Sequence, residues 1–289
     1  MPYFLIIISN ILGASTYAVS TAALKSFPEM DLIFLRMTIC AALFVPFAWS
    51  ARKRLAAASR EDWARMVAVG LFGYALPLLL ATYGVKLSSA SNTALLLGVE
   101  PVAIVLLSAL FLGERLTTIK ALSLILGLSG AALIAFQGPP SLNGVFSDRL
   151  KGDLILAAHG GCWALYSVIG KPSLQRVRPL DFTAVTSIVG FLGVGAWAGA
   201  SAQSFSWGAV APWAWLQAAY LAVAGGFLAV LLWNLALEKI EASTVANFIF
   251  LQPVVGVMLG IGFQGDTLSR WSMAGGALVL AGMWTALRS

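Results

Sequence analysis

The sequence predicts an all-α membrane protein, and three observations lead to this fold class. Of the 289 residues, 60% are hydrophobic and only 10% are charged, whereas soluble domains average roughly 45–50% apolar and about 25% charged residues. The mean hydropathy is +0.88. The apolar residues form continuous runs rather than the alternating segments of about ten residues that build a membrane β-barrel.

A helix needs about 20 mostly apolar residues to cross the hydrocarbon core of a bilayer. By this criterion the chain is predicted to cross the membrane ten times, with short connections. The expected spans are 3–25, 31–50, 66–86, 92–112, 118–137, 153–170, 181–200, 212–235, 243–263 and 271–288. The first run lacks a basic segment before it, so we interpret it as a retained helix rather than a signal peptide.

The basic residues predict the orientation, because Lys and Arg concentrate in the cytoplasmic loops of membrane proteins. If the N-terminus is cytoplasmic, the inner loops carry 12 of the 18 Lys and Arg residues and the outer loops carry 5, while Arg36 lies within a helix. Both termini are therefore predicted to be cytoplasmic. The expected location is the bacterial inner membrane, which the chain crosses several times.

Several other classes of protein are excluded by composition. The net charge of +6 is spread over short loops, so no nucleic-acid partner is expected. A single histidine and two cysteines, Cys40 and Cys162, do not make a zinc site. No glycine-rich phosphate loop follows a strand pattern. We therefore expect no metal and no cofactor.

An internal repeat is the most specific signal in the sequence. Glu100-Pro101-Val102 and Gly113-Glu114-Arg115-Leu116 return 152 residues later as Gln252-Pro253-Val254 and Gly265-Asp266-Thr267-Leu268, and Ala90-Ser91 returns as Ala242-Ser243 at the same offset. The chain is thus predicted to consist of a first repeat (1–137), a connecting loop (138–152) and a second repeat (153–289). Because five helices is an odd number, the second copy crosses the membrane in the opposite sense, as in many transporters.

With these motifs the chain resembles the drug/metabolite transporter superfamily, specifically its ten-helix members with two EamA-type repeats. Trp163 and Arg36 stand at positions where the family often carries these residue types. Within the superfamily the chain looks most like the bacterial aromatic amino acid exporters. It departs from a symmetric pattern, because Ala14 stands where the second repeat has Trp163, and Thr186 falls near the position that corresponds to Arg36, so an asymmetric cavity is expected.

A polar and aromatic stripe is predicted on two equivalent helices. His159, Trp163 and Tyr166 share one helix face, and Asn10 and Tyr17 lie at corresponding positions in the first helix. Such a stripe suits a substrate with an apolar body and polar ends. The alternative, an aromatic belt at the membrane interface, fits less well because Trp163 falls near the middle of its helix.

Polar residues beside two prolines are further candidates for substrate binding. Glu100 precedes Pro101 and Gln252 precedes Pro253, and each proline is expected to allow helix bending or hinging. Glu100 has three open interpretations: contact with a substrate ammonium group, proton coupling, or a structural ion pair with Arg36. Snorkelling to the outer interface is a further explanation for that arginine. The remaining candidates, each with an ordinary structural alternative, are Asn247 and Tyr83.

Small residues mark the spans 118–137 and 271–288. Ser123, Gly127 and Ala131 recur on one face of the first, and Gly275 and Gly282 on the second. Small residues let helices approach closely. We assign these helices to scaffolding, or to contact in a homodimer.

The sequence therefore predicts an inner-membrane transporter, not an enzyme. It would export small amphipathic metabolites, above all aromatic or bulky apolar amino acids, by alternating access. The rival within transport is the movement of cationic drugs or of another metabolite such as a sugar nucleotide. A remote alternative is an intramembrane enzyme that uses Glu100 and His159, although no nucleophile and base are paired in the sequence.

Overall fold

The fold was obtained as a computed structural model, which describes residues 1–87, 98–136, 149–200, 207–259 and 269–288. These residues are helical or lie in short connections, and none of them is in a strand. The all-α fold class is therefore confirmed for the described part of the chain. The repeat motifs at Ala90-Ser91 and 265–268 and the loop 138–148 lie outside the described residues.

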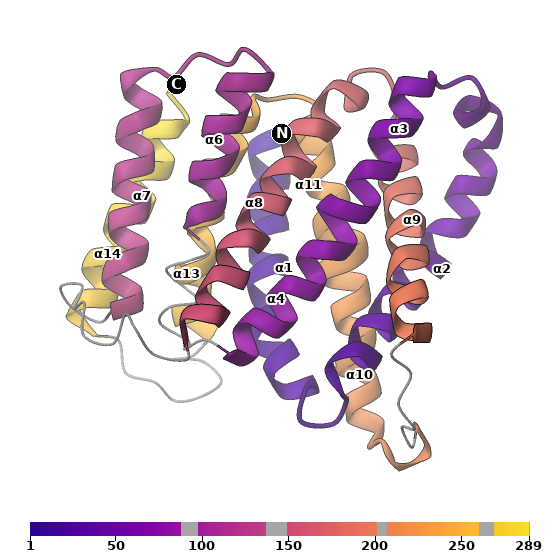
Figure 1. Cartoon of the computed structure of the whole chain (residues 1–289). Coiled ribbons are helices and arrows are strands. Elements are labelled where there is room, and N and C mark those ends of the chain that lie inside the picture. Colours follow the sequence, from indigo (N-terminus) through magenta and orange to yellow (C-terminus); the bar gives the residue numbers. More distant parts are fainter. Residues whose placement is uncertain (88–97, 137–148, 201–206, 260–268, 289) are drawn as a thin grey trace. The chain divides into compact units, whose positions relative to one another are not determined.

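Each predicted span overlaps a helix or a run of consecutive helices (Figure 1). In chain order they are α1 (Pro2–Ala23), α2 (Glu29–Ala56), α3 (Arg60–Ala68), η1 (Val69–Ala75), α4 (Leu76–Leu87), α6 (Val99–Phe111), α7 (Thr118–Phe136), α8 (Arg149–Leu174), α9 (Pro179–Ala200), η2 (Trp207–Ala209), α10 (Pro212–Tyr220), η3 (Leu221–Ala229), α11 (Val230–Leu237), α12 (Ala242–Asn247), η4 (Phe248–Phe250), α13 (Leu251–Leu259) and α14 (Arg270–Ala286).

Five helical stretches of the described chain are long and apolar enough to cross a membrane: Pro2–Ser20, Glu29–Ala56, Arg60–Gly84, Pro179–Ala198 and Pro212–Leu237. Shorter apolar helices add Val99–Phe111, Thr118–Ile134 and Ala242–Gly256. These lengths fit a multi-pass membrane protein. The number of ten crossings stays a prediction, as do the orientation of the termini and the inverted repeats.

The chain divides into two compact units. Unit 1 comprises Met1–Leu79 and Ile169–Lys239, and unit 2 comprises Leu80–Val168 and Ile240–Ser289. Each unit thus draws helices from both predicted repeats, so the division by contacts does not follow the division by sequence. The predicted domains 1–137 and 153–289 describe sequence copies and stay a prediction.

In unit 1, α2 packs along α9, and α1 packs on η3 and α11. The segments η1 and η3 are π-helices, which start at Val69 and Leu221 and are therefore also 152 residues apart. The hydroxyl of Tyr74 in η1 donates a hydrogen bond to the carbonyl oxygen of Gly226 in η3 at 3.1 Å. Short π-helical turns inside α-helices occur frequently at functional sites.

One end of unit 1 is held by ion pairs. The guanidinium of Arg54 in α2 donates two hydrogen bonds to Asp181 in α9, at 2.8 and 3.0 Å. Arg176, between α8 and α9, donates to the Asp62 carboxylate at 2.7 Å, and the Ser173 hydroxyl donates to it as well. The hydrogen bonds to Asp62 raise the pKa of Arg176. The C-terminal end of α2, the start of α3 and the start of α9 therefore lie on the same side of this unit.

In unit 2, α7 packs closely along α14 through the small residues (Figure 1). A Cβ atom built on Gly130 would lie 2.5 Å from the carbonyl oxygen of Gly275, so only glycine allows this approach. The hydroxyl of Ser123 donates to the Gly282 carbonyl oxygen at 2.8 Å. The predicted scaffold role of these faces is thus realised within one chain. A homodimer through the same helices stays a prediction.

Candidate functional site

The aromatic stripe on α8 forms a stacked pair. The rings of Trp163 and Tyr166 lie 4.9 Å apart and are nearly parallel, with an angle of 8° between their planes. Tyr166 is 0% exposed, whereas Trp163 keeps part of its surface accessible. Tyr166 therefore supports the tryptophan ring from behind, and Trp163 is the member of the pair that can contact a ligand.

Glu100 lies next to this helix. A Cβ atom on Gly160 of α8 would be 3.1 Å from the backbone nitrogen of Glu100 and 3.5 Å from its Cβ atom, so the glycine brings α6 and α8 together at this point. Glu100 is buried in the first turn of α6, and His159, the neighbour of Gly160, is also buried. The structure thus brings the predicted candidates Glu100 and His159 into one region of unit 2.

Within the described part of unit 2, the Glu100 carboxylate has no hydrogen-bond or ion-pair partner. A charged group buried in this way is costly unless a counter-charge or water compensates it. Its position in the first turn of α6 offsets part of the cost, because the N-terminus of a helix attracts negative charge. The arrangement leaves the carboxylate available for a cation or a proton.

The predicted span 243–263 contains a change of helix type. α12 ends at Asn247, one 3₁₀ turn (Phe248–Phe250) follows, and α13 begins at Leu251. Pro253 accounts for this, because it has no N–H to donate to the carbonyl of the residue four positions earlier, Ile249. This local irregularity fits the predicted bending at Pro253, while hinging during transport stays a prediction.

Two amides flank this irregular turn. Asn247 is buried, and its amide nitrogen donates to the Ser243 carbonyl oxygen at 2.9 Å. The Asn247 side-chain oxygen accepts no hydrogen bond from the described residues. Gln252 is half-buried in the first turn of α13. Both residues belong to unit 2, like Glu100 and Trp163.

Asn10 and Tyr17 belong to unit 1 instead. The Asn10 amide donates to the Ile6 carbonyl oxygen at 2.9 Å and is buried within α1. Tyr17 is half-buried in α1. A Cβ atom built on Gly225 of η3 would lie 3.7 Å from Nη2 of Arg36 in α2, and the Cys40 sulfur lies 3.6 Å from the Tyr74 hydroxyl. The two predicted stripes thus lie in different units, and the residues around Arg36 form a group that the sequence did not predict.

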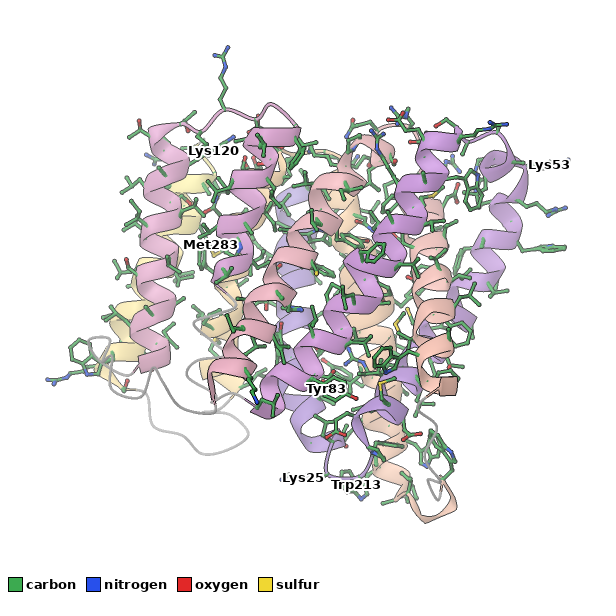
Figure 2. All side chains as sticks on the ribbon, viewed as in Figure 1. Lys25, Lys53, Tyr83, Lys120, Trp213 and Met283 are labelled. Carbon is green, nitrogen blue, oxygen red and sulfur yellow. The ribbon has the colours of Figure 1, made fainter. Side chains whose placement is uncertain are left out.

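Tyr83, labelled in Figure 2, lies near the end of α4 and is 37% exposed. Trp213, also labelled there, is 51% exposed in the first turn of α10. Tyr83 fits interface anchoring as well as ligand binding, and Trp213 fits interface anchoring. No group of three His, Cys, Asp or Glu side chains capable of holding a metal occurs among the described residues.

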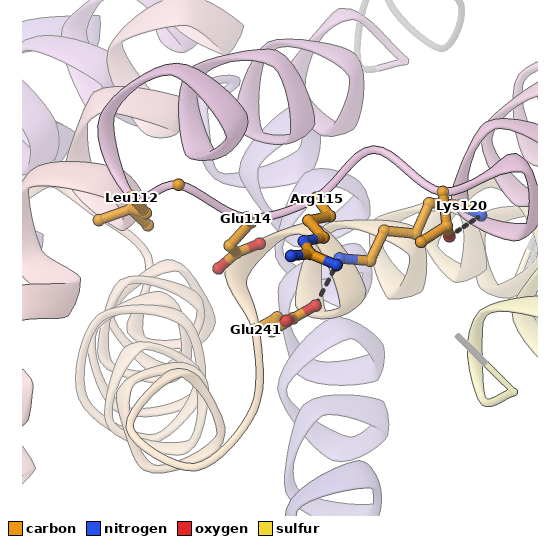
Figure 3. Close-up of a pocket in the computed structure, with 7 residues that line it drawn as sticks. Leu112, Glu114, Arg115, Lys120 and Glu241 are labelled. Carbon is orange, nitrogen blue, oxygen red and sulfur yellow. Dashed lines mark hydrogen bonds and ion pairs between the residues drawn. The ribbon is translucent and has the colours of Figure 1, made fainter.

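A pocket of about 490 Å³ lies at the loop between α6 and α7 (Figure 3). It is lined by Leu112, Gly113, Glu114, Arg115, Thr117, Lys120 and Glu241. Lys120 and Glu241 form an ion pair across it. None of the predicted substrate-binding residues lines this pocket.

Glu114, the acid of the repeat motif, has a clear structural role beside this pocket. Its two carboxylate oxygens accept hydrogen bonds from the backbone nitrogens of Ala242 and Ser243, at 2.7 and 2.9 Å. These are the first residues of α12, so Glu114 caps that helix from a distant part of the chain. The repeat motif singles out Glu114 in the sequence, but it does not reveal the hydrogen-bond partner Ala242, which lies 128 residues away along the chain.

The comparisons with known proteins agree with this architecture. The model of the EamA-like transporter family matches residues 1–136 and again 150–288. The chain is 27% identical over 219 residues to an uncharacterized transporter, YyaM, of Bacillus subtilis strain 168. The aligned region covers 75% of this chain and 70% of that protein. It is 24% identical to a probable terminal-alkyne amino-acid exporter of Streptantibioticus cattleyicolor, over 96% of this chain and 90% of that protein. A solved crystal structure shares the fold with a TM-score of 0.78, at 22% identity and over 98% of this chain and 95% of the other.

Proposed function

Because this chain belongs to the EamA-like transporter family and is therefore a membrane transporter, we propose that it exports small amphipathic amino acids with aromatic or bulky apolar side chains. The proposed location is the bacterial inner membrane, and the proposed mechanism is alternating access between two inverted halves of five helices each. In such transporters the substrate binds near the middle of the membrane and becomes accessible from each side in turn.

One observation carries the proposal: a stacked aromatic pair and a buried carboxylate lie in the same region of unit 2. Trp163 offers a flat apolar surface that Tyr166 supports. Glu100 is brought against the same helix by Gly160, and its carboxylate matches the ammonium group of an amino acid. Aromatic stacking favours a ring or another bulky apolar group on the substrate.

Two further facts support the proposal. The relative from Streptantibioticus cattleyicolor is described as a probable terminal-alkyne amino-acid exporter. The π-helices of unit 1 start 152 residues apart, which is the offset of the sequence motifs and agrees with two structurally related halves.

A second candidate function is the efflux of cationic drugs. The observation in its favour is the same buried carboxylate, which attracts a cation whether or not the ligand also carries an anionic group. The two functions differ in one requirement. A zwitterionic amino acid needs a partner for its carboxylate, whereas a cationic drug does not.

The purified full chain, reconstituted in liposomes, tests the proposal by counterflow of radiolabelled tryptophan and phenylalanine. Unlabelled amino acids, a sugar nucleotide and a cationic dye serve as competitors. We expect the aromatic and bulky apolar amino acids to compete best. Movement of the dye without movement of either amino acid would refute amino acid export and favour drug efflux.

Replacing Trp163 by alanine tests the aromatic surface. The lost stacking alone is worth about 0.5–1.5 kcal/mol, and the lost apolar contact adds to it, so the concentration for half-maximal transport should rise at least about fivefold. Trp284→Ala is the matched control, because Trp284 is 61% exposed on α14. If both variants transport equally well, Trp163 does not contact the substrate.

A further inference from the structure

We propose that the C-terminal end of α2 in unit 1 is a binding site for anionic phospholipids, which it holds by the phosphate of the headgroup. Arg52 and Lys53 of α2 form the centre of the site, and Arg60 and Arg178 lie on the neighbouring elements. We call these four residues the basic patch. The inference concerns the lipid around the protein and does not depend on which substrate is transported.

The position of the basic residues on α2 and α3 is the first argument. Arg52 and Lys53 lie in the last two turns of α2, and Arg60 is the first residue of α3. The indole nitrogen of Trp63 in α3 donates a hydrogen bond to the Leu55 carbonyl oxygen at 3.0 Å. This bond holds the start of α3 against the end of α2, so the three basic residues belong to one end of unit 1.

The two buried carboxylates at this end already have basic partners. Asp181 and Asp62 are each 2% exposed. Asp181 pairs with Arg54 at 2.8 Å, and Asp62 pairs with Arg176 at 2.7 Å. The first of these pairs also brings the start of α9, and with it Arg178, to the end of α2. Neither carboxylate is left to neutralise the basic patch.

The other acidic residues at this end do not neutralise the basic patch either. Glu61 pairs with Arg65 at 2.6 Å, and Glu238 is followed directly by Lys239. All four members of the basic patch are exposed, and none forms an ion pair with the described residues of unit 1. This end of the unit therefore presents an excess of positive charge to its surroundings.

The opposite end of α2 has no such excess. Its first turn carries Glu29 and Asp31, and the exposed Lys25 lies in the preceding turn. Lys53 and Lys25, both labelled in Figure 2, therefore differ in their electrostatic surroundings although both are exposed lysines of the same unit. Lys25 lies near two acids, whereas Lys53 lies near further bases. Only the C-terminal end of α2 suits an anion.

An exposed tryptophan beside the basic residues indicates a lipid rather than a soluble anion. Trp49 is 70% exposed, and the Arg52 guanidinium lies over its ring, 5.0 Å from the ring centroid. Nη1 of Arg52 donates a hydrogen bond to the Trp49 carbonyl oxygen at 3.0 Å, which leaves the other N–H groups to donate to a phosphate. Tryptophan is enriched where the hydrocarbon of a bilayer meets the headgroups.

The same face of α2 continues into an apolar surface. Val45, Trp49 and Arg52 follow one another at spacings of four and three residues, so they share one helix face. Val45 is 53% exposed and lies in Glu29–Ala56, a stretch long and apolar enough to cross a membrane. Along this face an apolar side chain, an interfacial ring and a cation suit the acyl chain, the glycerol region and the phosphate of one lipid.

Mass spectrometry of the intact full chain, released from detergent micelles with its bound lipids, tests the proposal. Phosphatidylglycerol is the anionic probe, and phosphatidylcholine is the probe without net charge. We expect the wild-type chain to bind phosphatidylglycerol at least tenfold more tightly. Each basic residue near an anionic headgroup contributes about fivefold in affinity, so Lys53→Gln should lose about fivefold and the double variant Arg52→Gln/Lys53→Gln about twentyfold. The affinity for phosphatidylcholine should change less than twofold.

Lys25→Gln is the matched control, because it removes the same charge from the opposite end of the same unit. It should leave the affinity for phosphatidylglycerol within twofold of the wild type. Equal binding of the two lipids by the wild-type chain, or equal losses in Lys53→Gln and Lys25→Gln, would refute the site. Soluble glycerol phosphate separates the two sources of a phosphate: if it binds as tightly as phosphatidylglycerol, the site takes a soluble anion and the lipid is refuted.

A measurement without mutation keeps the test decisive if the variants fail to fold. Raising the ionic strength from about 0.1 M to about 1 M shortens the range of electrostatic attraction from about 10 Å to about 3 Å. The wild-type affinity for phosphatidylglycerol should then fall at least fivefold, while that for phosphatidylcholine stays within twofold. A preference for phosphatidylglycerol that is unchanged by salt would contradict recognition by the basic patch.

Discussion

Replacement of Glu114 by alanine should destabilise the protein through the start of α12, far along the chain from the mutation. The Glu114 carboxylate accepts two backbone hydrogen bonds, from Ala242 at 2.7 Å and from Ser243 at 2.9 Å. Ala242 is 0% exposed and Ser243 is 1% exposed, so water cannot replace the lost acceptor. Glu241, which precedes α12, does not cap the helix and pairs with Lys120 instead.

The expected cost follows from these two bonds. Loss of a helix cap costs about 0.5–2 kcal/mol, and each buried N–H left without an acceptor costs about 1–3 kcal/mol. For two such groups we expect Glu114→Ala to lower the free energy of unfolding by about 2–4 kcal/mol. Glu114→Gln keeps the shape and one oxygen acceptor but loses the charge, so its cost should fall between that of alanine and zero.

Thermal unfolding of the purified protein in detergent measures this difference. A loss of this size should lower the unfolding temperature by roughly 5–15 °C. Arg115→Ala is the matched control, because Arg115 is the exposed neighbour in the same loop and lines the same pocket. We expect Arg115→Ala to have the highest unfolding temperature of the three variants, Glu114→Gln an intermediate one and Glu114→Ala the lowest.

The reasoning would be refuted if Glu114→Ala unfolded within about 1 °C of Arg115→Ala. In that case the two hydrogen bonds to α12 either do not form or have other acceptors available.

Two further predictions concern packing and orientation. Gly275→Ala should lower the unfolding temperature, because the new Cβ atom would lie 2.6 Å from the Gly130 carbonyl oxygen. Gly276→Ala is the control and should be neutral or stabilising, because nothing lies within 4 Å of its Cβ atom. Equal effects of the two variants would contradict the close contact of α7 and α14. Reporter domains inserted in the loops after Arg54 and after Arg176 should both report the cytoplasm. The two loops lie at the same end of unit 1, where Arg54 pairs with Asp181 and Arg176 pairs with Asp62. An external signal from either loop would contradict the predicted orientation.

The helices were predictable from apolar runs, but their ends were not. The run 31–50 predicts a span that the structure continues to Ala56, because Arg52 and its neighbours extend the helix beyond the apolar part. α3 begins at Arg60, six residues before the predicted 66, where the Ser59 hydroxyl accepts a hydrogen bond from the Asp62 backbone nitrogen. Hydrophobicity marks the part of a helix that suits lipid, whereas capping and polar residues decide where the helix ends.

The candidate site was predictable only where its residues are neighbours on one helix. The spacing of Trp163 and Tyr166 placed both on the same face, and their rings do stack. The surroundings of Arg36 depend on Gly225, which comes from another helix. No local sequence pattern predicts such a contact between helices. The hydropathy of the sequence does not predict the two π-helices either.

The repeat motif and the proposed substrate-binding residues serve different purposes, and this limits what family membership can predict. Glu114 is part of the motif that carries the family resemblance, yet in the structure it caps α12 and so contributes to folding. Trp163, in contrast, belongs to the proposed substrate site, and its predicted counterpart in the first repeat is Ala14. A motif that serves the fold does not by itself specify a substrate, because the substrate is determined by the side chains of the site. The motif therefore does not identify the substrate, and the residues to compare among relatives are Trp163 and Glu100.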